Sequence, residues 1–301
     1  MRKRRGYILV ATLALLVLSA TLLVTLARFA IDRSMKARQS QEDLQRRWGQ
    51  LSCQRAILPH AETILIQQEK RHQRPFPIYR ATIQLGAQYF DLVLSDEQAK
   101  ANVNAVLDLT DKQRTESQLR STLSPLSSHI HLHPSLVPTS APTTRPILPR
   151  YLNSFGQVFE STAPQNLLTS QFAAPAPADL LTFWTDGQMN IRRCSASSLA
   201  LLNSSILTQL DVRRLIEARN NLYLKNSSPI QPSANPLPVD PVRRLLNQAQ
   251  IPPNKANLHL TTTSKSHSLW IIVRDPCRQW YSLGVLDQTD QDHPRSNSFI
   301  W

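Results

Sequence analysis

The sequence has few of the residues, and none of the motifs, from which enzymes are commonly recognised. It contains 6 glycines and 3 cysteines in 301 residues, with no Gly-x-Ser-x-Gly, no phosphate-cradling glycine loop and no His-Glu-x-x-His. Cys53, Cys194 and Cys277 lie far apart without zinc-ligand spacing. A disulfide, preferably Cys194 with Cys277, and a set of unpaired buried thiols both stay open. We expect no enzymatic activity, no cofactor and no bound metal.

Three histidines have a spacing that could suit a metal site, but their surroundings do not favour one. His129, His131 and His133 alternate as they would on a strand, which places three imidazoles on one side. They stand in a serine- and proline-rich region without a fourth ligand, so we favour solvated loop histidines.

Positive charge is in excess, with 34 Lys and Arg against 21 Asp and Glu, for a net charge of +13. Such a balance suits nucleic acid, anionic lipid or an acidic partner. The charges are scattered along most of the chain, so a basic background without a patch is an equal alternative.

One long hydrophobic run is present, and it follows the basic residues 1–6. Residues 7–27 carry no charge and would form a helix of about 32 Å, close to the thickness of a bilayer core. The run is too long for a cleavable signal peptide and lacks its small-x-small cleavage site. We expect a retained single-pass membrane helix with its amino terminus in the cytoplasm.

The junction at Gly6 and Tyr7 resembles the class III signal of type IV pilins and pseudopilins, which is cut after a glycine that follows basic residues. The resemblance implies that prepilin peptidase cleaves after Gly6 and that Tyr7 becomes an N-methylated terminus. Most pilin-like proteins carry Glu at the fifth mature position, where this chain has Ala11. Among pseudopilins, the K-type minor pseudopilin of type II secretion systems lacks that Glu and is placed at the filament tip.

Patterning beyond the membrane predicts a helix and then a sheet. The larger residues Leu44, Trp48, Leu51, Leu58 and Leu65 recur at helical spacing and predict one buried stripe, with an interruption at Pro59. Strands are expected at 78–85 and 88–94, joined as a hairpin, and at 257–262, 268–274 and 280–286, where Tyr281, Leu283 and Val285 share a face.

A first motif begins at the end of the hairpin. The residues that match the Asp-Glu-x-x-Lys-x-Asn-x-Asn element of K-type minor pseudopilins are Asp96, Glu97, Lys100, Asn102 and Asn104. Catalytic acids or calcium ligands are an alternative, but adjacent carboxylates point apart on most backbones and nothing else acidic clusters nearby. We favour a scaffold in which the Asx side chains bind backbone groups.

A weaker echo at residues 181–191 contains Asp186, Gly187 and Asn190 and precedes two short helices, 198–202 and 212–219. These helices resemble the family's second module and also the helix-hairpin-helix fold that contacts DNA. No glycine stands between them, so DNA binding is the lesser alternative. Phosphate contacts would then fall to Arg192, Arg193, Arg213 and Arg214.

The sequence therefore resembles a K-type minor pseudopilin, which implies a pilin-like α+β fold. A long N-terminal transmembrane and amphipathic helix would pack on a small antiparallel sheet that carries a helical insertion similar to SAM or helix-hairpin-helix modules. The 21 prolines cluster in expected linkers. The expected parts are a leader (1–6), membrane helix (7–29), its periplasmic continuation (30–73), first part of the head (74–110), Pro/Ser-rich insertion or linker (111–178), helical module (179–225), Pro-rich linker (226–255), C-terminal strands (256–288) and flexible tail (289–301).

By the same resemblance, the work of the protein is assembly rather than catalysis. It would initiate and cap a periplasmic pseudopilus that exports proteins across the outer membrane. Its partners would be other minor pseudopilins, the major pseudopilin, the inner-membrane assembly platform and prepilin peptidase. The chain would stand in the inner membrane with its C-terminal domain in the periplasm.

Overall fold

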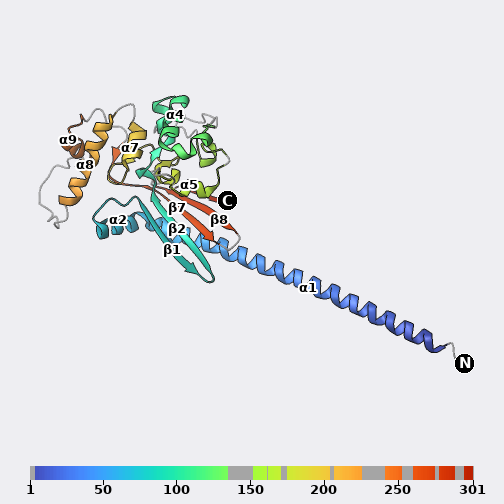
Figure 1. Cartoon of the computed structure of the whole chain (residues 1–301). Helices are drawn as coiled ribbons and strands as arrows, with labels where there is room; N and C mark the ends of the chain where they lie inside the picture. The colour runs from blue at the N-terminus through green and yellow to red at the C-terminus, as the bar shows by residue number, and fades with distance from the viewer. Residues whose placement is uncertain are drawn as a thin grey trace. The chain divides into compact units, whose positions relative to one another are not determined.

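The computed structural model describes residues 4–134, 152–160, 162–170, 175–203, 207–225, 241–252, 260–274, 278–288 and 295–300. The chain divides into two compact units, Met1–Leu51 and Ser52–Trp301. Figure 1 shows the order of their elements. The structure is mixed α+β with a long apolar N-terminal helix and an antiparallel sheet, which confirms the predicted class.

The first unit is helical and begins helix α1 (Arg4–Ile57), the one helix among the described residues that is long and apolar enough to cross a membrane. Leu44, Trp48 and Leu51 are 57%, 60% and 45% exposed. The predicted buried stripe is therefore wrong at these three positions. Helical spacing places them on one face, but burial also needs a facing apolar surface.

Helix α1 ends where proline interrupts its backbone. Pro59 stands inside a 3₁₀ turn, η1 (Leu58–His60), and helix α2 (Ala61–His72) follows it. The missing N–H and fixed φ of proline explain the predicted interruption. Leu58 and Leu65 are buried, as the stripe predicts for this part of the chain. Helix α2 ends at His72, and the next residue, Gln73, takes a left-handed φ of 50°.

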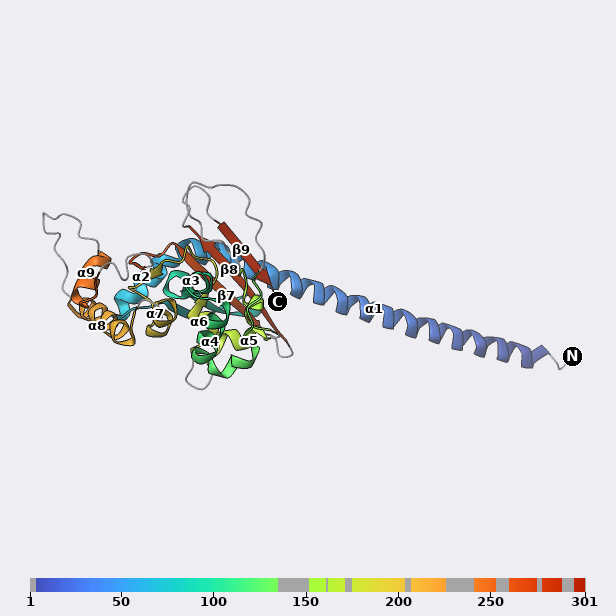
Figure 2. The same cartoon turned by 90° about the horizontal axis from the view of Figure 1, so that it is seen from above.

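A single five-stranded antiparallel sheet, in the order β1-β2-β7-β8-β9, is the frame of the second unit. Strands β7, β8 and β9 lie side by side in Figure 2. The predicted hairpin and the last two predicted strands are confirmed. The strands are β1 (Ile78–Leu85), β2 (Gln88–Asp96), β7 (Ser266–Arg274), β8 (Gln279–Asp287) and β9 (Arg295–Ile300).

Two expectations for the C-terminal region are corrected. The flexible tail expected at 289–301 includes β9, which pairs with β8 from Ser282↔Ile300 to Asp287↔Arg295. Of the strand expected at 257–262, residues 257–259 lie outside the described residues, and the rest contains β6 (Leu260–Thr261), which pairs with β5 (Met189–Asn190) outside the main sheet. Strand β9 is fixed by pairing with the preceding strand β8, and β6 by pairing with the distant β5, and local residue preferences reveal neither pairing.

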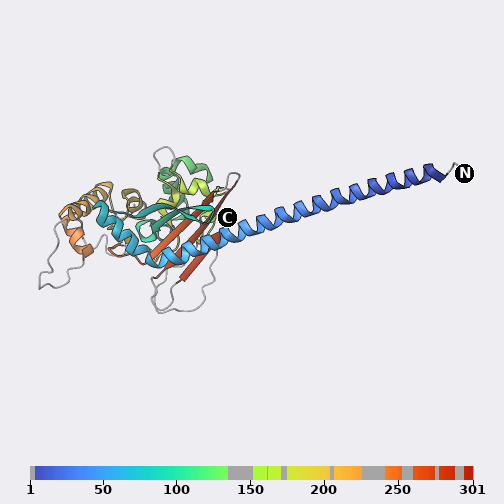
Figure 3. The same ribbon diagram turned by 90° about the horizontal axis from the view of Figure 1, so that it is seen from below.

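The two faces of the sheet carry separate cores because side chains alternate along each strand. On one face Leu58 and Leu65 pack with Phe90, Leu92 and Leu94 of β2. Figure 3 shows the light-blue C-terminal end of α1 and helix α2 beside the strands on this side. The other core contains Tyr281, Leu283 and Val285, which share a face as predicted, together with the buried residues of the insertion.

The insertion connects β2 to β7 and is mostly helical. Phe155 makes edge contacts with Phe183 and Trp184 and a tilted contact with Trp270 of β7, so it is anchored on the sheet. Its elements are η2 (Glu97–Ala99), β3 (Ala101–Asn102), α3 (Val103–Leu109), α4 (Lys112–Thr122), η3 (Ser124–His129), η4 (Phe155–Gln157), α5 (Pro164–Leu168), α6 (Pro177–Leu180), β4 (Leu181–Thr182), β5, α7 (Ala196–Asn203), α8 (Gln209–Lys225), α9 (Pro241–Gln248) and β6.

The stretch expected to be an insertion or linker, residues 111–178, supplies part of this core. Leu119, Phe155 and Leu167 are buried in it. Residues 135–151 of this stretch lie outside the described residues. Helices α7 and α8 confirm the two helices predicted near 198–202 and 212–219, with longer bounds.

Gly284 of β8 leaves no room for a side chain under the helical layer. A Cβ atom there would lie 2.9 Å from Gln54 Cδ and 3.0 Å from Leu58 Cδ1. We expect Gly284→Ala to lower the free energy of unfolding by about 1–2 kcal/mol, because packed cores resist added volume. Urea unfolding of the detergent-solubilised full chain, followed by tryptophan fluorescence, measures this.

Gly156→Ala is the matched control, because a Cβ at Gly156 would meet only Ser154 Oγ, at 3.9 Å. Equal stability of the two variants would contradict the close approach at Gly284.

Candidate functional site

The residues predicted for leader processing stand at the start of α1. Gly6 and Tyr7 belong to this helix, which begins at Arg4, and Tyr7 is 79% exposed. Ala11 is exposed as well. Cleavage after Gly6, N-methylation of Tyr7 and the tip position marked by Ala11 stay predictions.

The first motif begins with Asp96, a fully buried carboxylate at the end of β2. Its side chain caps η2, as expected for an Asx residue that binds backbone groups. Five donors converge on its two oxygens: the backbone N–H groups of Gln98 (2.9 Å) and Ala99 (3.2 Å) on Oδ1, and Ser264 Oγ (2.5 Å), Asn190 Nδ2 (3.1 Å) and Arg193 Nη1 (3.1 Å) on Oδ2. So many donors occupy the lone pairs that a general base or a calcium ligand would need.

Glu97 and Lys100 form a buried ion pair beside Asp96. Lys100 Nζ contacts Glu97 Oε1, and the side chains are 2% and 0% exposed. Lys100 also donates to Ser95 Oγ at 2.9 Å, while Ser268 Oγ of β7 donates to Glu97 Oε1. The pair ties η2 to the central strands and has no access to solvent.

The two asparagines of the motif also bind backbone groups. Asn102 Oδ1 caps α3 by accepting the N–H groups of Asn104 (2.9 Å) and Ala105 (3.3 Å). Asn102 Nδ2 donates to Thr185 O at 2.8 Å. Asn104 Nδ2 donates to Leu152 O, and Leu152 N–H donates to Asn104 Oδ1, both at 2.9 Å. The first motif therefore holds distant loops, in line with the favoured scaffold role.

The structure brings the second motif directly against the first. Asp186 Oδ1 accepts from Gln98 Nε2 at 3.2 Å, and Asn190 Nδ2 donates to Asp96 Oδ2 at 3.1 Å. Gly187 has a φ of 85°, a conformation that side chains rarely adopt. The sequence presents the two motifs as separate echoes, whereas the fold joins them.

The centre of the site is Arg193, whose side chain is 0% exposed. Its Nε donates to Glu69 Oε1 at 2.7 Å, and its Nη1 donates to Glu62 Oε2 at 2.5 Å as well as to Asp96. Burial alone would lower the pKa of Arg193, but the hydrogen bonds and charges of these carboxylates raise it. The guanidinium therefore stays charged and joins α2, the end of β2 and the turn after β5.

Sequence reasoning missed the acidic and imidazole side chains of this cluster. Glu62 also lies 3.0 Å from His267 Nε2, and Glu69 accepts from Arg192 Nη2 at 2.7 Å. A signal was present: Glu69 follows Leu58 and Leu65 at helical spacing, where an apolar residue is expected. A charged residue in such a position calls for a buried partner.

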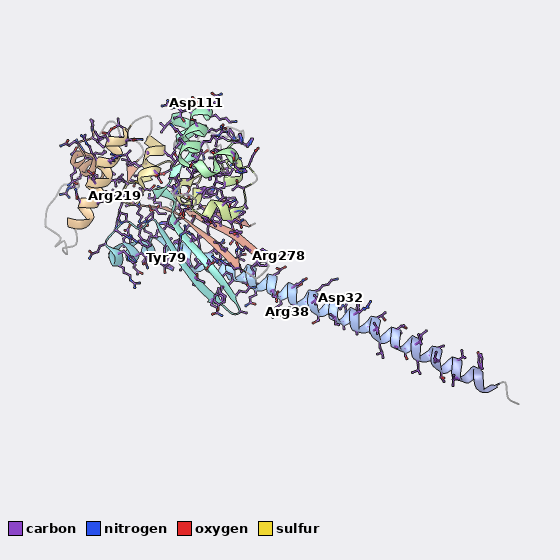
Figure 4. All side chains as sticks on the ribbon, in the orientation of Figure 1. Asp32, Arg38, Tyr79, Asp111, Arg219 and Arg278 are labelled. Atoms are coloured by element: carbon purple, nitrogen blue, oxygen red, sulfur yellow. The ribbon has the colours of Figure 1, made fainter. Side chains whose placement is uncertain are left out.

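Two of the four arginines considered for phosphate contact are held in these pairs. Arg193 is buried, and Arg192 donates to Glu69. Arg213 and Arg214 are exposed on α8. Figure 4 marks Arg219 on the same helix, where its Nη1 donates to Cys194 O at 2.5 Å.

The cysteines have buried surroundings where they are described. Cys53 and Cys194 are free and buried, and Cys277 of the preferred pair lies outside the described residues. Burial raises the pKa of Cys194 to about 12, despite the lowering effect of Arg219. Such a thiol is a poor nucleophile at neutral pH.

Two of the three histidines contact separate partners rather than one another. His133 Nε2 lies 3.2 Å from Glu160 Oε1, and His131 Nδ1 lies 3.4 Å from Arg120 Nη2. Across the described ranges, no group of three His, Cys, Asp or Glu residues is placed to share a metal ion.

A hollow of about 360 Å³ lies between α8 and α9. Its polar lining residues include Arg214, Glu217 and Gln250. No nucleophile and base face each other among these residues, so the hollow does not indicate an active site.

The fold and the buried cluster define an α+β protein with a long apolar N-terminal helix and charged residues in structural positions. The sequence matches no family model, and no curated protein matches it. Among solved structures, the chain is similar to one from the GspK-GspI-GspJ complex of the enterotoxigenic Escherichia coli type 2 secretion system. The identity is 14% and the TM-score 0.43, over 88% of this chain and 99% of that chain. At so low a TM-score the similarity carries no argument about the role of this chain.

Removing Arg193 should unfold much of the head. We expect Arg193→Met to lower the free energy of unfolding by about 3–5 kcal/mol, because buried Glu69 and Asp96 lose their counter-charge. The free energy of unfolding of Arg193→Lys should lie between those of the wild type and Arg193→Met, since an ammonium cannot span three carboxylates. Arg213→Met, at an exposed site, is the control. Urea midpoints of the full chain measure all three, and equal midpoints would contradict a supporting role.

The free energy of unfolding of the second unit should also depend on pH, because Glu62 is protonated in acid. Burial would raise the pKa of Glu62, but hydrogen bonds and charges from His267 and Arg193 lower it from 4.5 to about 2. A carboxylate with a lowered pKa stabilises the fold above its unfolded pKa, and this contribution is lost as the pH falls from about 4.5 through 2. Glu62→Gln should unfold more easily at pH 7 and lose less stability between pH 5 and pH 2.5 than the wild type. Glu217→Gln, exposed on α8, should keep the wild-type profile.

Proposed function

We propose that the protein is a minor pseudopilin of a type II secretion system, of the K type, which helps to initiate and cap a periplasmic pseudopilus. The observation that carries the proposal is the junction at Gly6. A basic leader there meets an apolar helix that continues, without a break in α1, to Ile57. A chain with this arrangement can be cut at the membrane and can then present the apolar helix to neighbouring subunits.

The buried motif supports a mechanical role. The side chains of Asp96, Asn102 and Asn104 accept hydrogen bonds from backbone N–H groups. Asp96 also binds Asn190 of the second motif. Glu97 and Lys100 neutralise each other inside the head. Residues used in this way build a rigid body that can transmit force.

The K-type assignment depends on Ala11. A Glu inside a membrane helix is costly without a partner, and the partner in a filament is taken to be the terminus of a neighbouring subunit. A subunit at the tip has no neighbour beyond it, which agrees with Ala11. In this function the amino terminus faces the cytoplasm and the head faces the periplasm. The partners are other minor pseudopilins, the major pseudopilin, the assembly platform and prepilin peptidase.

A membrane-anchored DNA-binding protein is the second candidate, favoured by the exposed pair Arg213 and Arg214 on α8. The other two arginines argue against it. Arg193 cannot reach a phosphate from its buried position, and Arg192 is paired with Glu69.

The amino-terminal mass of membrane-purified protein tests the proposal. We expect a chain that starts at Tyr7 and carries one added methyl group when it is produced with a prepilin peptidase. Gly6→Ala should keep its leader, because the peptidase requires glycine at the cut. Gly156→Ala, remote from the leader, should be processed like the wild type.

An intact Met1, or a cut beyond Ala27, would overturn the pseudopilin proposal. The DNA-binding alternative would then be tested by retention on duplex DNA at low and high salt.

A further inference from the structure

The segment of α1 that follows the apolar run carries a dense group of cations. Arg28, Arg33, Lys36 and Arg38 stand within eleven residues, with Asp32 as the one acid between them. We call these four cations the basic collar. All four are exposed.

Within the described chain, the collar has few internal partners. Arg38 Nε lies 3.1 Å from Glu42 Oε1, and this pair is 83% and 52% exposed. Arg33 Cζ lies 5.1 Å from the centre of the Phe29 ring. No ion pair within 4 Å joins Arg28, Arg33 or Lys36 to another described residue. Figure 4 shows Asp32 and Arg38 on this stretch of α1.

The collar surrounds the helix. At about 100° per residue, Lys36, Arg33 and Arg38 lie about 80°, 140° and 280° around the axis from Arg28. A protein that docks on one side of a helix would meet about half of these cations. A layer of lipid headgroups encircles a membrane helix and meets all of them.

The position along the axis agrees with headgroups too. Arg28 directly follows the charge-free residues 7–27, so it marks the end of the hydrocarbon layer. Arg38 lies about 15 Å further, and the interfacial layer is about 5–8 Å thick on each side. Long arginine and lysine side chains reach back over such distances.

We propose that the basic collar binds anionic phospholipid headgroups of the leaflet at the C-terminal end of the membrane helix. The proposal rests on the membrane-spanning part of the proposed function. It adds a lipid class and names the residues that recognise it. Anionic lipid would hold the helix at a fixed depth, with Arg28 at the edge of the hydrocarbon layer.

The test is lipid selection by the full-length protein. Wild-type protein is reconstituted in vesicles of equal phosphatidylglycerol and phosphatidylcholine and extracted in mild detergent, and mass spectrometry measures the retained lipids. We expect phosphatidylglycerol to be enriched about tenfold or more, with the enrichment falling in high salt. Millimolar inorganic phosphate should not displace it, because free phosphate lacks the anchoring in a bilayer.

The variant replaces Arg28, Arg33, Lys36 and Arg38 with Gln and should lose about tenfold of this enrichment. A control with the same change in formal charge replaces Arg71, Arg74, Arg213 and Arg214, which are exposed in the second unit. The control should keep the enrichment. Equal retention of both lipids by the wild type, or equal loss in both variants, would overturn the proposal.

Flotation with pure phosphatidylcholine vesicles separates this proposal from the membrane span. Wild type and collar variant should both float and resist an alkaline wash, because the apolar helix alone inserts. If the wild type does not float, both the membrane-spanning helix and lipid binding by the basic collar are contradicted. If the wild type floats but shows no lipid preference, only the proposal that the basic collar binds anionic lipid is contradicted.

Discussion

A single buried guanidinium, that of Arg193, links the main parts of the second unit. It binds carboxylates from α2 and from the end of β2, and it follows β5 in the insertion. Without it, the buried carboxylates of Glu69 and Asp96 would lose a counter-charge that each contacts directly. The position of helix α2 on the sheet and the position of the insertion therefore depend on the same side chain.

This constraint explains why the two polar motifs contain so many asparagine and aspartate residues. Asp96 accepts five hydrogen bonds, and Asn190 reaches it from the second motif. Each short Asx side chain satisfies backbone groups in a turn where no strand or helix can do so. Taken alone, the acidic residues of the first motif look catalytic. In this fold they connect the sheet to its insertion.

Local patterns were sufficient for much of the fold. The apolar run, the break at Pro59 and the hairpin of β1 and β2 follow from periodicity and from proline, which act within a few residues. Longer-range facts were not accessible in this way. The exposure of Trp48, the pairing of β6 with β5 and the partners of Glu69 depend on which surfaces meet in three dimensions. The sequence indicated which polar residues make up the two motifs, but it did not indicate that the motifs lie against each other.

The pairing of β2 with β7 has a consequence for the order in which the protein forms. Ser95 and Ser268 touch across this pair although 173 residues separate them in the chain. The β1–β2 hairpin can close early, whereas the centre of the sheet must wait for β7, and such distant contacts slow folding. Until then the apolar face of β2 lacks its neighbour, and Glu62 of α2 lacks its contact with His267 of β7. An early hairpin is thus completed by a strand that is synthesised much later.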